Sequence, residues 1–231
     1  MFYWDWTMIL VIPGLLLGIW AQYRVSSSFS KYSKVTTRVG QPADEELVAK
    51  IRELVMENMF CHVSVREIGG KLSDHYDPRS NTLRLSDGVF GSTSVAAIGV
   101  AAHECGHAMQ QQEGYGPLKL RSAMVPVVNI GSNLYFPIFL FGLLFSWEPL
   151  IYVGIACFSL TLLFGLVTLP VEFNASKRAM AALSDGGYMT GEELDGARAV
   201  LNAAAMTYVA SVVSSLLQLL RLLIISRNNR D

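Results

Sequence analysis

The sequence predicts an α-helical membrane protein with about four transmembrane helices and one small water-facing α+β unit. Hydrophobic residues make up 52% of the 231 residues and charged residues only 16%, whereas an average soluble domain has about 25% charged residues. The apolar residues are gathered into long runs, as membrane-spanning helices require. A net charge of −1 without a basic stripe argues against a nucleic-acid partner. The composition therefore indicates a lipid bilayer as the surroundings.

The first apolar run is expected to be an N-terminal transmembrane anchor over residues 1–24. Residues 4–23 carry aromatic side chains at both ends of the run, as is typical of the two membrane interfaces. A cleaved signal peptide is the alternative, but Asp5 stands where a basic segment is expected and no clear cleavage site follows. We therefore expect the segment to be retained.

Residues 25–124 are expected to form the α+β unit. Pro42 and three acidic residues begin a helix predicted over residues 42–60. One face of this helix is apolar and consists of Leu47, Ile51, Leu54 and Val55. Three short alternating runs then predict a small β-meander. These runs are residues 62–68, 71–76 and 82–86.

The rest of the chain is expected to return to the membrane. A transmembrane hairpin is predicted over residues 125–170, with a tight turn at 147–149. Its second half, residues 150–170, has no charged residue over 21 positions, which is the clearest transmembrane signal in the chain. Residues 171–231 then provide a short polar segment and a long helix over 199–225. A buried core helix is the alternative for that last span.

The most informative motif is His103-Glu104-Cys105-Gly106-His107, an H-E-x-x-H pattern in an alanine-rich helical stretch. On a helix, the two histidines lie about 40° apart around the axis and one turn apart along it. They can therefore bind one metal ion, and zinc suits imidazole ligands. Glu104 can then act as the base that takes a proton from a metal-bound water. Two buried histidines that form ordinary hydrogen bonds are the alternative.

A zinc site needs a third protein ligand, and Glu172 is the strongest candidate. It follows a wholly apolar span, where a carboxylate is costly unless it is paired or bound to a metal. Small residues on the same helical face, Ala175, Ser176 and Ala179, would let this helix approach the histidine helix closely. The remaining candidates are His62, His75, Asp185 and the acidic residues near Glu192. An interfacial glutamate near Lys177 and Arg178 is the structural alternative.

Five blocks of the sequence, in order, resemble the YugP-type bacterial membrane-embedded neutral zinc metallopeptidases. The blocks are DHYDPRSNTLRLS at 74–86, VAAHECGHAMQ at 100–110, RSAMVPVVNI at 121–130, TLPVEFNASKRA at 168–179 and AAAMTYVA at 203–210. The resemblance implies a zinc-dependent protease of the glutamate-liganded (gluzincin-like) kind, with the α+β unit built around the H-E-x-x-H helix. The family is similar to the heat-shock and CAAX-processing membrane proteases, in which an aspartate four residues after the ligand glutamate orients a zinc histidine. Ser176 stands at that place here and would accept a weaker bond.

The resemblance also implies a substrate-binding strand before the zinc helix, which by position is residues 72–76. An open strand edge recognises a peptide through main-chain hydrogen bonds. His75 and Tyr76 would then lie near the scissile bond, and His75 and Tyr208 are candidates to stabilise the oxyanion. A second metal at residues 74–77 is an alternative, and a polar turn capped by Asp77 and Pro78 is the simpler interpretation.

Positive charges near the span ends predict the orientation. The side that holds the motif carries Arg24, Lys31, Lys34, Arg38, Lys119, Arg121, Lys177, Arg178 and Arg198, and the other carries Arg227 and Arg230. The positive-inside rule places the motif in the cytoplasm, at the plasma membrane. The three cysteines have no metal-binding or redox spacing, and Cys105 is expected to pack on the helix face away from the histidines.

Together these features predict a multi-pass zinc endopeptidase with one zinc ion per chain and a peptide or membrane-protein substrate. His103, His107 and Glu172 would bind the metal, and Glu104 would be the general base. Two other classes remain open: a zinc-retaining membrane scaffold or chaperone partner, and a zinc amidase acting on a non-peptide substrate. An intact Glu104 argues against the scaffold, since metal binding alone needs no base. No oligomeric state is indicated.

Overall fold

The protein is seen in a computed structural model that describes residues 6–49 and 63–228. The chain divides into two compact units. The first, here called the helical unit, comprises Met1–Gln22, Lys119–Pro170 and Met206–Asp231. The second, here called the mixed unit, comprises Tyr23–Leu118 and Val171–Ala205. The division falls within long helices, so that Val171–Ala205 joins the unit containing the H-E-x-x-H motif.

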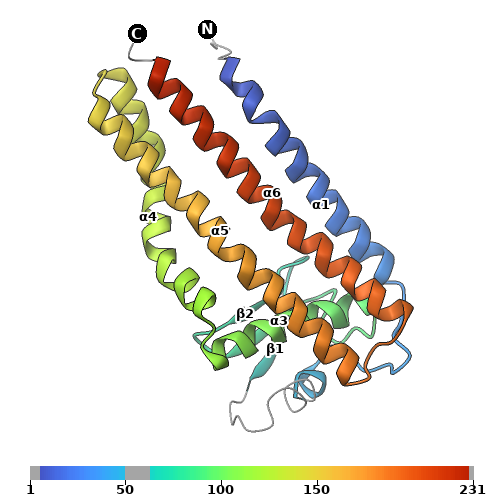
Figure 1. The fold of residues 1–231 in the computed structure, drawn as a ribbon. Helices are drawn as coiled ribbons and strands as arrows, with labels where there is room; N and C mark the ends of the chain where they lie inside the picture. The colour runs from blue at the N-terminus through green and yellow to red at the C-terminus, as the bar shows by residue number, and fades with distance from the viewer. Residues whose placement is uncertain (1–5, 50–62, 229–231) are drawn as a thin grey trace. The chain divides into compact units, whose positions relative to one another are not determined.

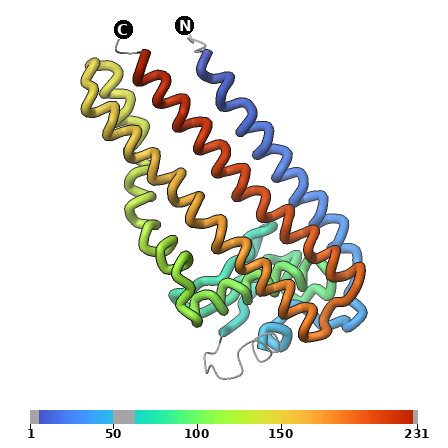
Figure 2. The backbone as a smooth tube through the Cα atoms, viewed as in Figure 1, coloured from blue at the N-terminus to red at the C-terminus, as the bar shows by residue number. Residues whose placement is uncertain are grey.

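The helical unit is built from parts of four long helices (Figures 1 and 2). These are α1 (Ile12–Tyr32, preceded by the 3-10 helix η1, Trp6–Leu10), α4 (Gly116–Leu144), α5 (Glu148–Asp185) and α6 (Glu192–Asn228). Glycines allow close packing: a Cβ on Gly142 would lie 2.7 Å from the Ile151 nitrogen of α5, and one on Gly14 would lie 2.9 Å from Ser214 Oγ of α6. Small residues commonly bring membrane helices this close.

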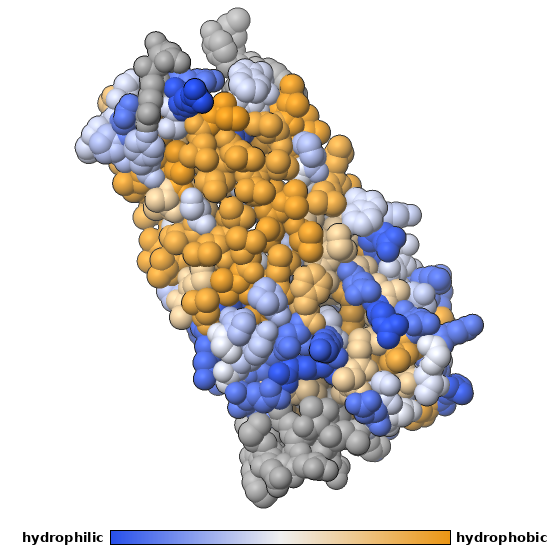
Figure 3. Space-filling model, in the orientation of Figure 1, coloured by the Kyte–Doolittle hydropathy of each residue, from blue (hydrophilic) through white to orange (hydrophobic). Residues whose placement is uncertain are grey.

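The surface of the helical unit is strongly apolar, as the orange area over these helices in Figure 3 shows. Leu16, Ile130, Phe136 and Leu144 are each at least 59% exposed. In the most apolar windows of the four helices only 11–22% of residues are buried. Side chains of this kind are stable when lipid covers them. The structure thus confirms four long apolar helices among the described residues, although α1 continues to Tyr32, beyond the predicted anchor at 1–24.

A three-stranded sheet lies in the mixed unit, with the order β1-β3-β2. The strands are β1 (Ser64–Ile68), β2 (His75–Asp77) and β3 (Thr82–Ser86). β3 pairs antiparallel with β2 but parallel with β1, so the predicted meander is wrong. The physical reason is burial. Four of the five residues of β3 are buried, whereas only one of the five residues of β1 and none of the three residues of β2 are buried. The most buried strand takes the centre of the sheet.

Two other predicted elements of this unit differ from the structure or lie partly outside it. The strand expected over 71–76 is shorter, because Leu72 has a left-handed backbone with φ 54° that a regular strand does not accept. Of the helix expected over 42–60, residues 45–49 are helical. Leu47 is fully buried in the core. Ile51, Leu54 and Val55 lie outside the described residues.

Helix α3 (Val95–Glu113) carries the H-E-x-x-H motif through the centre of the mixed unit. Ser94 caps its start by accepting a hydrogen bond from the Ala97 N–H. Gly114 ends the helix in a left-handed conformation with φ 68°. Most of α3 is buried, and Cys105 packs in the hydrophobic core, as expected. Burial among apolar residues raises the pKa of the Cys105 thiol, so this cysteine stays protonated.

Helices α3 and α5 approach each other closely at Gly106. A Cβ placed there would lie 2.5 Å from the Ala175 carbonyl oxygen and 3.1 Å from the Ala175 Cα. Real Cβ atoms do not tolerate such contacts with backbone. Ala175 and Ala179, the small residues predicted to face this helix, are fully buried. Close packing against α5 therefore requires glycine at position 106, the second x of the H-E-x-x-H motif.

Gly106→Ala should destabilise the protein although alanine normally favours a helix. Overpacking against the α5 backbone is expected to cost about 1–3 kcal/mol, more than the gain of about 1 kcal/mol in helix propensity. Thermal unfolding in detergent measures the effect. Gly116→Ala is the matched control, because a Cβ there meets no atom within 4 Å. Equal stability of Gly106→Ala and wild type would contradict the packing described.

Candidate metal centre

The structure brings His103, His107 and Glu172 together within the mixed unit. The histidines stand one turn apart on α3, and Glu172 stands on α5, 65 positions after His107 along the chain. One ligand atom from each of the three lies within 4.8 Å of the others. His62 lies outside the described residues. Among residues 6–49 and 63–228, no other group of three or more His, Cys, Asp or Glu side chains converges in this way, and the group does not include His75 or Asp185.

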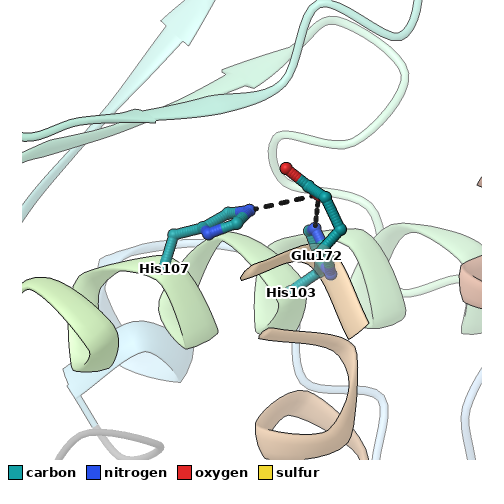
Figure 4. A group of neighbouring side chains, drawn as sticks. All are labelled: His103, His107 and Glu172. Atoms are coloured by element: carbon teal, nitrogen blue, oxygen red, sulfur yellow. Dashed lines mark ion pairs between the residues drawn. The ribbon is translucent and has the colours of Figure 1, made fainter. Parts of the chain in front are cut away.

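Both imidazoles point toward the Glu172 carboxylate (Figure 4). The Nε2 atom of His103 lies 3.4 Å from Glu172 Oε2, and that of His107 lies 3.5 Å from the same oxygen. The rings are nearly perpendicular, with centroids 4.8 Å apart. Glu172 is buried, and each imidazole is at most 14% exposed. Two imidazole nitrogens and one carboxylate oxygen that converge at a shielded point form a donor set that fits zinc.

The second nitrogen of each histidine is also engaged. His103 Nδ1 lies 3.1 Å from the hydroxyl of Ser176, which is one turn beyond Glu172 on α5. His107 Nδ1 lies 3.0 Å from Gln110 Oε1. Both rings are therefore held through Nδ1, and this leaves Nε2 directed at Glu172. Zinc-binding histidines are typically oriented by such bonds.

Negative charge around His107 favours a cation. Burial opposes the protonated ring, but Glu172 and Glu104 outweigh it and raise the pKa of His107 above its ordinary value. Glu104 is itself buried on α3, beside His103 in the chain. Positive charge between the two rings is therefore favoured, and a divalent ion would supply it.

The residues predicted to contact the substrate or to stabilise the oxyanion lie in different surroundings. His75 is exposed on β2, with Nδ1 2.8 Å from the Ser73 carbonyl oxygen. The Tyr76 hydroxyl donates to Asn81 Oδ1 at 2.6 Å, and its ring packs on the core. Tyr208 lies on α6 in the helical unit, outside the unit that holds the histidines.

The acidic residues beside His75 serve the local fold. Asp74 Oδ1 accepts hydrogen bonds from both the N–H and the hydroxyl of Ser86. Asp77 accepts from the Ser80 hydroxyl and pairs with Arg84 at 3.0 Å. These bonds agree with the simpler interpretation of a polar turn capped by Asp77 and Pro78, which follows strand β2.

Sequence reasoning missed a set of polar residues behind His107. Gln110 is fully buried, and its Nε2 donates to the Val171 carbonyl at 2.8 Å and to Asn174 Oδ1 at 2.9 Å. Arg178 Nε donates to the same Asn174 oxygen at 2.7 Å, and its guanidinium forms two 2.6 Å bonds with Glu113. The available signal was the spacing: Gln110 and Glu113 follow His107 by one and nearly two turns.

The fold and the site define a class: membrane proteins with a buried histidine–histidine–glutamate cluster. Residues 7–227 match the family described as "putative neutral zinc metallopeptidase", and the chain belongs to this family. Over 224 residues it is 44% identical to the protein named "Putative membrane protease YugP" from Bacillus subtilis (strain 168). The match covers 97% of this chain and 98% of that protein. No solved structure matches the chain.

These similarities confirm the predicted family resemblance. They support zinc as the metal, a peptidase as the kind of enzyme and a membrane as the location at the level that the family and relative names state. The four apolar helices agree with that location.

In the metal-free protein, Glu172→Gln should lower the pKa of His107, because the amide removes a negative charge while the burial remains. Nuclear magnetic resonance of labelled histidines follows this pKa. The folded-state pKa of His107 is raised, so its contribution to stability is present at low pH and lost as pH rises through that pKa. The variant should therefore lose stability relative to wild type mainly at low pH. An unchanged His107 pKa would contradict the electrostatics described.

Proposed function

We propose that the protein is a membrane-embedded zinc endopeptidase in which His103, His107 and Glu172 bind one zinc ion. The observation that carries this proposal is the convergence of both Nε2 atoms on one buried carboxylate oxygen, in a chain of a zinc metallopeptidase family. A bound zinc ion would lower the pKa of a water molecule and polarise a peptide carbonyl. The H-E-x-x-H helix is then the centre of the α+β protease domain.

Glu104 is proposed as the general base. It takes a proton from the attacking water and passes it to the nitrogen of the leaving amine. Its burial keeps bulk water away from the carboxylate, and its position on α3 keeps it next to His103. The carboxylate also acts electrostatically on His107, which supports a role for Glu104 at the metal site.

We propose that an extended peptide binds along β2. This strand lies at an outer position of the sheet and contacts α3. At the opposite side of the sheet, β1 is already engaged, because the Val65 N–H donates to the Glu45 carboxylate at 3.5 Å. Strand addition recognises the main chain and so accepts many sequences. Since the Tyr76 hydroxyl is engaged by Asn81, exposed His75 is the better candidate to meet the substrate near the scissile bond.

The substrate is proposed to be a membrane protein or a peptide close to the bilayer. Glu172 follows the charge-free residues 150–170 by two positions in the continuous helix α5. About 21 residues at about 1.5 Å each cross the hydrocarbon layer, so Glu172 would emerge at the membrane surface. The charge distribution supports a site on the cytoplasmic side.

We propose four parts along the chain. These are an anchor at 1–24, a protease domain at 25–124, a transmembrane hairpin at 125–170, and a third-ligand and C-terminal segment at 171–231.

Glu172→Ala should lose zinc, since two ligands on one helix turn do not complete the site. Purified wild type should contain about one zinc per chain. Competition with a chelator measures the affinity of each variant. Glu148→Ala, at the far end of the same helix, is the control and should bind like wild type. Unchanged affinity in Glu172→Ala would reassign the third ligand.

Glu104→Gln should keep zinc and lose activity by about 10²–10⁴-fold, because the amide has the same shape but cannot accept a proton. Proteomic comparison of native membranes that contain wild type or this variant reveals substrates, and a peptide derived from one then gives the rate. Cleavage by Glu104→Gln at the wild-type rate would exclude the proposed base.

Single cysteines introduced in a cysteine-free background test the orientation. Membrane-impermeant labelling of intact cells should reach positions 147–149 but not 77–81. The positive charges near the mixed unit provide the physical reason. Labelling at 77–81 in sealed cells would place the site on the outer side.

A further inference from the structure

A hydrogen-bond chain runs behind His107 and ends in an ion pair. It passes from His107 Nδ1 to Gln110 Oε1 at 3.0 Å, from Gln110 Nε2 to Asn174 Oδ1 at 2.9 Å, and from there to Arg178 Nε at 2.7 Å. Arg178 is held in turn by two 2.6 Å bonds to Glu113. The chain alternates between α3 and α5, the helices that supply the three proposed ligands.

The direction of every bond in this chain is determined by its chemistry. Arg178 Nε always carries a hydrogen, so the Asn174 atom that faces it must be the carbonyl oxygen. The Val171 carbonyl can only accept, so the Gln110 atom that faces it must be the amide nitrogen. Gln110 then presents its oxygen to His107. This oxygen only accepts, so Nδ1 of His107 must carry the hydrogen.

His103 is held by a different kind of bond. Its Nδ1 faces the Ser176 hydroxyl, which can rotate and either donate or accept. That bond therefore does not determine which nitrogen of His103 carries a hydrogen. The two histidines of one motif thus differ: the contacts of His107 determine which of its nitrogens carries a hydrogen, whereas the contact between His103 and Ser176 does not.

We propose that Gln110, Asn174 and Arg178 are positioning residues that keep a hydrogen on Nδ1 of His107 and so present Nε2 as its metal-binding atom. The inference rests on the proposed function only in naming His107 a zinc ligand. Gln110 has no exposed surface and uses both amide hydrogens, so its side chain is held in this orientation. The ion pair between Glu113 and Arg178 fixes the far end of the chain.

Two substitutions at Asn174 separate this role from simple packing. Asn174→Leu fills a similar volume but offers no oxygen, so it should weaken zinc binding by about ten- to a hundredfold, as loss of an orienting partner typically does. Asn174→Asp keeps an oxygen for both Gln110 and Arg178 and should stay within about threefold of wild type. Gln110→Met removes the hydrogen bond to His107 itself and should weaken zinc binding as much as Asn174→Leu does. It replaces Asn174→Leu in the test if that variant does not fold. Zinc affinity is measured by chelator competition, and thermal unfolding controls for stability.

Nitrogen-15 spectra of labelled histidines provide a readout that packing alone does not move. In wild type, His107 should show a hydrogen-bonded Nδ1–H both without metal and with zinc. This signal should weaken in Asn174→Leu and Gln110→Met and persist in Asn174→Asp. Zinc bound through Nδ1 of His107, or an equal loss of affinity in both Asn174 variants, would overturn the inference. A wild-type Nδ1–H signal in a protein that binds no zinc would support the inference and refute the proposed function.

Discussion

The site depends on the close approach of α3 and α5 at Gly106. The α5 backbone at Ala175 occupies the space that a Cβ on Gly106 would need. This approach places Glu172, three residues before Ala175, opposite the two histidines, and places Ser176 beside His103. The same approach lets Gln110 of α3 reach the Val171 carbonyl of α5. This one helix contact thus brings the three candidate ligands together, along with the bonds that hold the Nδ1 atoms of the two histidines.

Burial gives the cluster its preference for a cation. A carboxylate taken out of water is costly unless positive charge or hydrogen bonds compensate for it. Glu172 is buried against two imidazoles, which carry positive charge only when protonated. Glu104 adds a second buried carboxylate on the same helix. The two carboxylates therefore concentrate negative charge at this position, and polar contacts direct the Nε2 atoms of both histidines toward it.

Much of this arrangement could be predicted from sequence, for reasons that are local. The four apolar helices follow from composition, and the pairing of His103 with His107 follows from helix geometry. Glu172 was singled out by the unfavourable position of a carboxylate after an apolar span, and the structure brings it to the histidines. The sheet order was wrong, because parallel pairing of β1 with β3 depends on burial across the unit and not on the alternation within each run. Gln110 and Asn174 were missed because their role depends on a carbonyl and a guanidinium that only the tertiary fold brings near them.

Anomalous diffraction at the zinc absorption edge, from crystals of the zinc-loaded protein, tests the central claim most directly. One strong peak per chain is expected, bounded by Nε2 of His103, Nε2 of His107 and a carboxylate oxygen of Glu172. Each of these atoms should lie about 2.0–2.2 Å from the peak. A peak beside His75 or Asp185 without one at the cluster, or zinc held through Nδ1 of either motif histidine, would contradict the account.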